Sequence, residues 1–272
     1  QKLSEQFTLG TTVTGYSNNY RMIEFKNATH SNEPSFDDYY ETTEDNLWKN
    51  VQSSVYLNYK WKESKLDFAV DYLKFDNDQP VDYFVNLVSP QSVSDLNFNS
   101  KKSSPFTISV YSTDYENKFT ENVRFSAGLK YIVNDFTNTN YIYREGIMDN
   151  RFVNSSQLDE KIGAAYSQLN FPLSEKVKVQ AGLRYEFTQT QVKSLLDASI
   201  FVDREYGNFF PSIFLSYKIN DFNNLNLSSS RRINRPAFTD MAPFVFFVDL
   251  EQAFEGNVSL KPSYTNNFQL DY

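Results

Sequence analysis

Apolar and polar residues alternate along most of this chain, and stripes with the 3.6-residue period of a helix are scarce. The alternation is clearest in four segments, which are 51–61, 123–131, 177–187 and 213–219. A period of two places successive side chains on opposite faces of a strand. These strands are predicted to run to roughly 11–14 residues, longer than the 5–6 usual in soluble sheets. That length suits a tilted crossing of a membrane.

The predicted connections between strands alternate between short and long. The short turns are 62–64, 116–120, 173–175 and 221–223, and the long polar connections are 27–46, 77–104, 138–157, 192–207 and 235–261. Outer-membrane barrels combine short periplasmic turns with long extracellular loops in this way. We therefore predict an all-β fold: an antiparallel up-and-down transmembrane β-barrel, partial, of about ten strands.

Two of these strands are harder to assign than the others. The first, near Phe7–Phe25, is interrupted by Gly10, Gly15 and Asn18-Asn19. The strand at 162–171 leaves open which of its faces points outward.

Two strands carry near-identical pentapeptides, Ala127-Gly128-Leu129-Lys130-Tyr131 and Ala181-Gly182-Leu183-Arg184-Tyr185. Their spacing of about two hairpins places a tyrosine at the same height on strands of the same direction, as an aromatic girdle requires. The alternative is a soluble sandwich whose tyrosines cover a half-buried face.

Composition favours the membrane interpretation and excludes several functions. Aromatic residues make up 17% of the chain although the mean hydropathy is −0.55, and the longest apolar run is far short of the roughly 18 residues of a spanning helix. A net charge of −8 argues against nucleic acid, and the absence of cysteine excludes disulfides and thiolate sites. No signal peptide begins the chain, so a mature or truncated form is expected.

No catalytic residue, metal ligand or cofactor site is predicted, and the protein is not expected to be an enzyme. His30 is the only histidine, and we interpret it as a solvated loop residue without partners for metal binding or acid–base catalysis. The acidic stretch 37–45 lacks the glycine spacing of a calcium loop and is also interpreted as a solvated outer loop.

Charged residues on the polar side of the predicted strands are the candidates for ligand binding. They are Arg124, Lys130, Lys178, Arg184, Glu186 and Arg232, with Arg235 near the extracellular rim. In a wide barrel such residues line the wall and contact a plug or a solute, or they form ion pairs between neighbouring strands.

The connection after Arg235 is rich in phenylalanine, and we expect it to pack on itself, fold into the lumen or present an apolar face to a partner. Arg232 and Arg235 are expected to anchor it through its carboxylates or to meet an anionic ligand. The carboxylates in question are Asp240, Asp249, Glu251 and Glu255. On the anchoring hypothesis, replacing Arg232 by alanine loosens the loop to protease.

The segment from Ser230 to Pro262 resembles a known family. The motifs are Ser230-Arg231-Arg232-Ile233-Asn234-Arg235-Pro236, then Glu255-Gly256-Asn257 and Leu260-Lys261-Pro262, with upstream matches at 160–166, 180–186 and 210–212. They are similar to the outer-membrane β-barrel family of TonB-dependent receptors, especially those of Bacteroidetes. The resemblance covers roughly residues 47 to 272.

This resemblance implies a 22-stranded barrel in the Gram-negative outer membrane, plugged by an N-terminal domain, that imports a scarce solute with energy from TonB. The implied partners are outer-membrane lipid, the plug, the TonB system, a small-molecule or oligomeric substrate (siderophore, cobalamin, glycan or peptide) and a surface lipoprotein. Residues 1–272 are then expected to be part of one barrel domain, with the plug and the remaining strands absent. A small closed ten-stranded barrel is the alternative, because Phe268, Leu270 and Tyr272 resemble a barrel C-terminus.

Two other functions stay open at this point. After the importer, the second hypothesis is a surface-binding adhesin or structural barrel protein without active transport, with the loops as its binding surface. A ten-stranded hydrolase is less consistent with a single histidine.

Overall fold

The structure, a computed structural model, describes residues 4, 6–30, 36–89, 92–241, 245–247 and 253–272. In these residues, twelve strands form one antiparallel sheet and two short strands form another. The strands of the large sheet are β1 (Phe7–His30), β2 (Phe36–Trp61), β3 (Ser64–Ser89), β4 (Ser92–Ser103), β5 (Phe106–Lys118), β6 (Arg124–Arg144), β7 (Ile147–Met148), β8 (Asn154–Pro172), β9 (Val177–Ser194), β10 (Ile200–Lys218), β11 (Asn224–Asn234) and β14 (Ser263–Asp271). The short pair is β12 (Val245–Phe247) and β13 (Ala253–Glu255), and a single helical turn, α1, spans Phe238–Met241.

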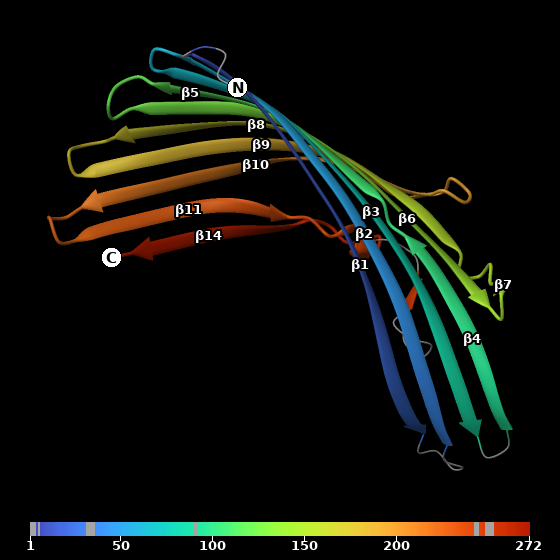
Figure 1. Cartoon of the computed structure of the whole chain (residues 1–272). Coiled ribbons are helices and arrows are strands. Elements are labelled where there is room, and N and C mark those ends of the chain that lie inside the picture. The colour runs from blue at the N-terminus through green and yellow to red at the C-terminus, as the bar shows by residue number, and fades with distance from the viewer. Residues whose placement is uncertain (1–3, 5, 31–35, 90–91, 242–244, 248–252) are drawn as a thin grey trace.

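The large sheet is a meander, as the sequence predicts. Its strands follow the order β1-β2-β3-β4-β6-β8-β9-β10-β11-β14, and β5 pairs with both β3 and β6. β4 and β5 therefore occupy one position in the sheet, interrupted at Ser104-Pro105, where proline offers no N–H to the ladder. Figure 1 shows a curved, twisted sheet with the short hairpin turns at one end, while the long strands β1, β2 and β3, together with β4, reach far beyond the other strands at the opposite end. The predicted all-β antiparallel fold is confirmed.

The pairing register gives the sheet two chemically different faces. From β6 to β11, even-numbered residues lie opposite even-numbered residues along nearly all of each strand pair, so they share a face. On β9 this face carries Lys178, Gln180 and Arg184, and we call it the polar face. The opposite face carries Val179 and Leu183, and we call it the apolar face. The register also resolves the strand at 162–171, whose even-numbered residues lie on the polar face.

The apolar face is exposed. Leu129 is 62% exposed, Leu183 48% and Phe209 57%, and the two tyrosines of the pentapeptides, Tyr131 and Tyr185, lie on the same face. Water disfavours a continuous apolar band of this kind, whereas the hydrocarbon core of a bilayer covers it.

The long connections are much shorter than predicted, because strands occupy most of them. The expected loop 27–46 is largely the paired ends of β1 and β2, and the expected loop 77–104 is largely β3 paired with β4. Polar cross-strand pairs support these extensions. Arg21 Nε lies 2.7 Å from Asp45 Oδ1, and Gln79 donates to Glu44 over 2.7 Å. Outside the bilayer both faces of a strand can be polar, so the alternation that identifies strands disappears from the sequence.

The same extension corrects three smaller expectations. His30 ends β1 opposite Phe36 and is not in a loop, and the acidic stretch lies in β2. β1 itself is continuous through its glycines. At Gly10 the ring of Tyr56, from the neighbouring strand, fills the space that a side chain would occupy.

No helix in the described residues is long and apolar enough to span a membrane.

Candidate functional site

The described parts of the connection between β11 and β14, at 235–241 and 253–262, contact the polar face of the sheet. Met241 of α1, only 5% exposed, packs with Leu158, Val192 and Val202, which come from β8, β9 and β10. Val258, later in the same segment, lies against this cluster. Of the three arrangements that the sequence leaves open for this phenylalanine-rich segment, the described residues show two: Met241 and Val258 fold inward onto the wall, and β12 pairs with β13 within the segment itself. The side chains of Phe238, Phe244, Phe246, Phe247 and Phe254 lie outside what the structure describes.

On the polar face, the side chains change from polar near the short turns to apolar at the opposite ends of the strands. This change allows the segment to fold inward. Near the short turns most even-numbered positions are charged or polar, with exceptions such as Phe214, whereas Leu158, Val192 and Val202 lie at the far end. An apolar patch there is buried by the returning segment and avoids water.

Glu186 of β9 holds the start of the returning segment. Its Oε2 accepts a hydrogen bond from Arg235 Nη2 at 2.7 Å, and its Oε1 accepts one from Arg184 Nε at 2.5 Å. Arg235 also donates to Thr188 Oγ1 over 3.0 Å. The Glu186 side chain is 11% exposed and that of Arg235 23%, so water screens this pair less than a surface pair.

Arg235 is therefore a fixed charge. Burial lowers its pKa, but the hydrogen bond to Glu186 and the interactions with Glu186 and Tyr206 outweigh burial and leave the pKa above its ordinary value. The guanidinium therefore stays protonated at physiological pH.

Arg204 of β10 holds the end of the same segment. Its two terminal nitrogens donate to the backbone carbonyl oxygens of Leu260 and Val258. A planar guanidinium with fixed donors is suited to such a double contact. Arg235 and Arg204 thus fasten the two ends of the segment to the wall, close to Pro236 and Pro262.

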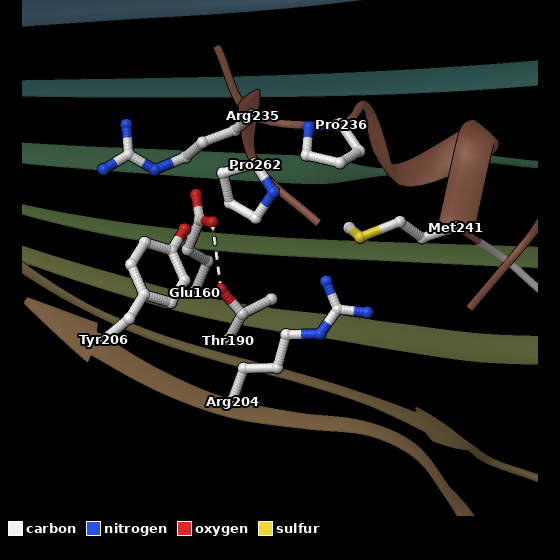
Figure 2. Close-up of a pocket in the computed structure, with 8 residues that line it drawn as sticks. All are labelled: Glu160, Thr190, Arg204, Tyr206, Arg235, Pro236, Met241 and Pro262. Carbon is white, nitrogen blue, oxygen red and sulfur yellow. Dashed lines mark hydrogen bonds between the residues drawn. The ribbon is translucent and has the colours of Figure 1, made fainter. Parts of the chain in front are cut away.

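A small pocket lies where the segment meets the wall (Figure 2). It is lined by Glu160, Thr190, Arg204, Tyr206, Arg235, Pro236, Met241 and Pro262. Thr190 donates to Glu160 over 3.2 Å, and Asn134 of β6 donates to the other oxygen of that carboxylate over 3.0 Å. In the described residues, Arg235 Nε is buried without a hydrogen-bond partner.

The polar contacts continue from this pocket down the wall. The guanidinium carbon of Arg184 lies 5.2 Å from the ring centroid of Tyr166 on β8. Tyr166 donates from its hydroxyl to Asp114 Oδ1 of β5 at 2.5 Å. A row of interacting side chains, Asp114, Tyr166, Arg184, Glu186 and Arg235, therefore crosses the sheet from β5 to the returning segment.

The structure brings together only three of the seven candidate residues, Arg184, Glu186 and Arg235. Arg124 lies near the short turns, where its Nε is 3.2 Å from Glu116 Oε1. Lys130, Lys178 and Arg232 lie on the polar face, as predicted, but outside the pocket lining.

The prediction that Arg232 and Arg235 anchor the segment through its own carboxylates is wrong for the residues that the structure describes. Arg235 binds Glu186 of the wall, and exposed Arg232 makes no ion pair or hydrogen bond in the described part of the chain. The carboxylate of Asp240 accepts the backbone N–H of Ala237. Asp249 and Glu251 lie outside the described residues.

Sequence reasoning missed Arg204, Glu160, Thr190 and Tyr206. All four occupy even-numbered positions of strands with alternating side chains, so the two-residue period predicts that they lie on the polar face. Their convergence depends on the path of the segment 235–262, which no local pattern encodes.

The part of the chain that the structure describes holds no cluster of metal ligands. No group of three or more histidine, cysteine, aspartate or glutamate side chains there is placed to hold a metal ion. The arginines bind carboxylate and backbone carbonyl groups. These contacts hold the segment against the wall.

Comparison with known proteins gives one family match. A sequence profile of the outer membrane protein beta-barrel family matches residues 57–272. No match was found among curated proteins.

Receptors are among the solved structures with a similar arrangement. The ferripyoverdine receptor of Pseudomonas aeruginosa has 10% identity and a TM-score of 0.46, and the match covers 99% of this chain and 46% of that one. The ferric yersiniabactin uptake receptor of Yersinia pestis has 10% identity and a TM-score of 0.42, with 97% and 51% covered. The chain thus spans about half the length of these structures.

Proposed function

We propose that this chain, which belongs to the outer membrane protein beta-barrel family, forms part of the barrel wall of a TonB-dependent receptor of the Bacteroidetes type. As a family member, the protein lies in the outer membrane. Its role in this proposal is the import of a scarce solute and not catalysis. Residues 1–272 are part of one barrel domain, and a plug in the same polypeptide and the TonB system are its partners.

The observation that carries the proposal is the fastened segment 235–262 on the polar face. A wall with an apolar face toward lipid and a polar face toward the interior is common to outer-membrane barrels. Here part of the polar face, beyond the bilayer, is covered by the chain's own outer segment, tied by Arg235 to Glu186 and by Arg204 to backbone carbonyls. A segment held in this way narrows the entrance to the interior and sets which solutes reach the wall below.

The solute belongs to one of four classes: ferric siderophores, cobalamins, glycans or peptides. Of the seven candidates, Lys130, Lys178 and Arg232 are the wall and rim charges available to it. Arg124 is paired with Glu116, and Arg184, Glu186 and Arg235 are engaged in fastening the segment. A surface lipoprotein is a further candidate partner for an oligomeric substrate.

Uptake measurements test the proposal. Cells that produce the full-length protein are given one radiolabelled probe from each class: a ferric siderophore, cyanocobalamin, an oligosaccharide and a short peptide. We expect one probe to accumulate above the level in cells without the protein, and a protonophore to abolish the difference, because the energy comes from the inner membrane. Surface binding of a probe or of host material that is equal with and without the protonophore would instead favour an adhesin.

A further inference from the structure

Arg231 of β11 places a charge on the apolar face of the sheet. It occupies an odd-numbered position, and its partner in the ladder is Asn266 of β14. The other apolar-face positions of β6, β8, β9, β10, β11 and β14 carry no charge in the ranges that form the band. They are the odd-numbered residues of 125–131, 163–171, 177–187, 207–217 and 225–233, and the even-numbered residues of 264–270. A charge on a lipid-facing position is unfavourable near the middle of a bilayer, so Arg231 calls for a physical reason.

The register places Arg231 at the outer end of this apolar band. Counted along the ladders, Tyr185 of β9, Phe209 of β10 and Ile233 of β11 form one row, and Tyr264 of β14 lies opposite Ile233. The rings of Tyr185 and Phe209 lie 4.9 Å apart between centroids. Aromatic residues gather where the hydrocarbon core meets the lipid headgroups. Arg231 is two residues closer to the short turns than this row, and it therefore lies just inside the headgroup level.

The side chain of Arg231 extends outward from this position, toward the headgroup level. Its guanidinium carbon lies 4.9 Å from the ring centroid of Tyr264, which belongs to the aromatic row. A long basic side chain reaches the interface in this way while its stem stays in apolar surroundings. The ring attracts the positive charge, but it offers the N–H donors no oxygen acceptor.

The donors of Arg231 have no acceptor within the described residues. The side chain makes no hydrogen bond or ion pair there, and its Nε is buried. Arg184 and Arg235 on the polar face, by contrast, each bind a carboxylate. Asn266, directly opposite Arg231, adds a side-chain amide to the same face. Guanidinium and amide donors thus lie next to each other on a surface that is otherwise apolar.

From these observations we propose that Arg231 and Asn266, with the Tyr264 ring supporting the guanidinium, bind the phosphate group of a lipid in the outer leaflet. A guanidinium binds phosphate through two parallel N–H bonds, and a phosphorylated headgroup supplies its oxygens at the level of the aromatic row. The acyl chains of this lipid lie over the apolar face below. Exposed side chains of the same two strands line that surface: Leu227, Phe268 and Leu270.

The choice of leaflet rests on the proposed function, in which the short turns face inward. Phosphate binding itself depends only on the apolar face being in contact with lipid. The lipid-binding site and the import function can therefore fail separately.

Native mass spectrometry of the full-length protein in detergent tests the site. The probe is lipid A, a phosphorylated lipid, and the control probe is the same lipid after removal of its phosphates. We expect one lipid A to stay bound to each protein and the dephosphorylated form to bind about ten-fold more weakly, because charge-assisted hydrogen bonds are lost. Equal retention of the two lipids would overturn the proposal.

Matched variants test the residues. Arg231→Gln is expected to weaken lipid A binding about ten-fold, because the charge and the fork of donors are lost. Arg232→Gln removes the same charge from the polar face of the same strand, one residue further on, and should leave retention unchanged. Equal losses for the two variants would indicate general attraction by positive charge and overturn the proposal.

Thermal unfolding gives a second measure of the same binding. Lipid A stabilises the folded protein that binds it, so it should raise the unfolding midpoint of the wild type and not that of Arg231→Gln. A rise of equal size in both proteins would contradict the site.

Two further outcomes distinguish the lipid from other occupants. A large excess of inorganic phosphate should leave lipid A bound, because the acyl chains contribute to binding. Displacement would identify a soluble anion as the ligand and overturn the lipid assignment. A dimer that Arg231→Gln dissociates would overturn it in favour of a second copy. Loss of the uptake signal with lipid A still retained would refute the import function alone.

Discussion

At the scale of single residues, Glu186 organises the site. Its carboxylate accepts one hydrogen bond from an arginine of its own strand. It accepts another from an arginine of the returning segment, 49 residues away in the chain. The sequence predicts that Arg184 and Glu186 share a face, because both occupy even-numbered positions of one strand. It does not predict that Arg235 meets Glu186 while Arg232 meets no partner in the described residues, because that choice depends on how the chain turns after β11.

Replacing Arg235 by alanine is expected to loosen the segment 235–262. The loss of its bonds to Glu186 and Thr188 should cost about 1–2 kcal/mol, less than a fully buried charged pair because Arg235 is 23% exposed. Limited proteolysis of the folded protein should then cleave the segment about ten-fold faster, since cleavage follows the open population. Arg232→Ala is the matched control and should leave the rate unchanged. Equal rates for the two variants would show that Arg235 does not fasten the segment.

At the scale of elements, sequence pattern and structure agree where the strands meet lipid and differ beyond it. The alternating segments at 123–131 and 177–187 lie in β6 and β9. The outer ends of β1–β4 were not predictable from alternation, because residues such as Arg21, Asp45 and Gln79 are polar wherever they point. The contacts in which a tyrosine ring lies over a glycine of the neighbouring strand were also not predictable, because they depend on the pairing register.

Alanine substitutions at Gly128 and Gly163 are expected to change the stability of the protein by different amounts. Gly128→Ala should displace the Tyr166 ring and break its bond to Asp114, and destabilise the protein by about 1–3 kcal/mol. Gly163→Ala, on the opposite face of β8, meets only ordinary contact with Tyr131 at 3.9 Å and should be neutral. Urea unfolding in detergent measures both. A Gly163→Ala effect as large as that of Gly128→Ala would argue for a general need for glycine and against the tyrosine contact.

At the scale of the whole molecule, the sheet separates two environments. Its apolar face exposes leucine, phenylalanine and tyrosine over several strands, while its polar face carries the paired charges and the returning segment. Family membership and this separation place the protein in the outer membrane.

The most direct test of this account is the environment of each residue along β9 in a lipid bilayer. The 272 residues contain no cysteine, so single cysteines between Val177 and Phe187 can each carry one spin label. Labels at Val179 and Leu183 are expected to collide with oxygen dissolved in lipid, and labels at Lys178 and Gln180 with a water-soluble nickel complex, which gives a period of two. Uniform access of the nickel complex at every position, or the opposite alternation, would contradict the assignment of this sheet as a membrane wall.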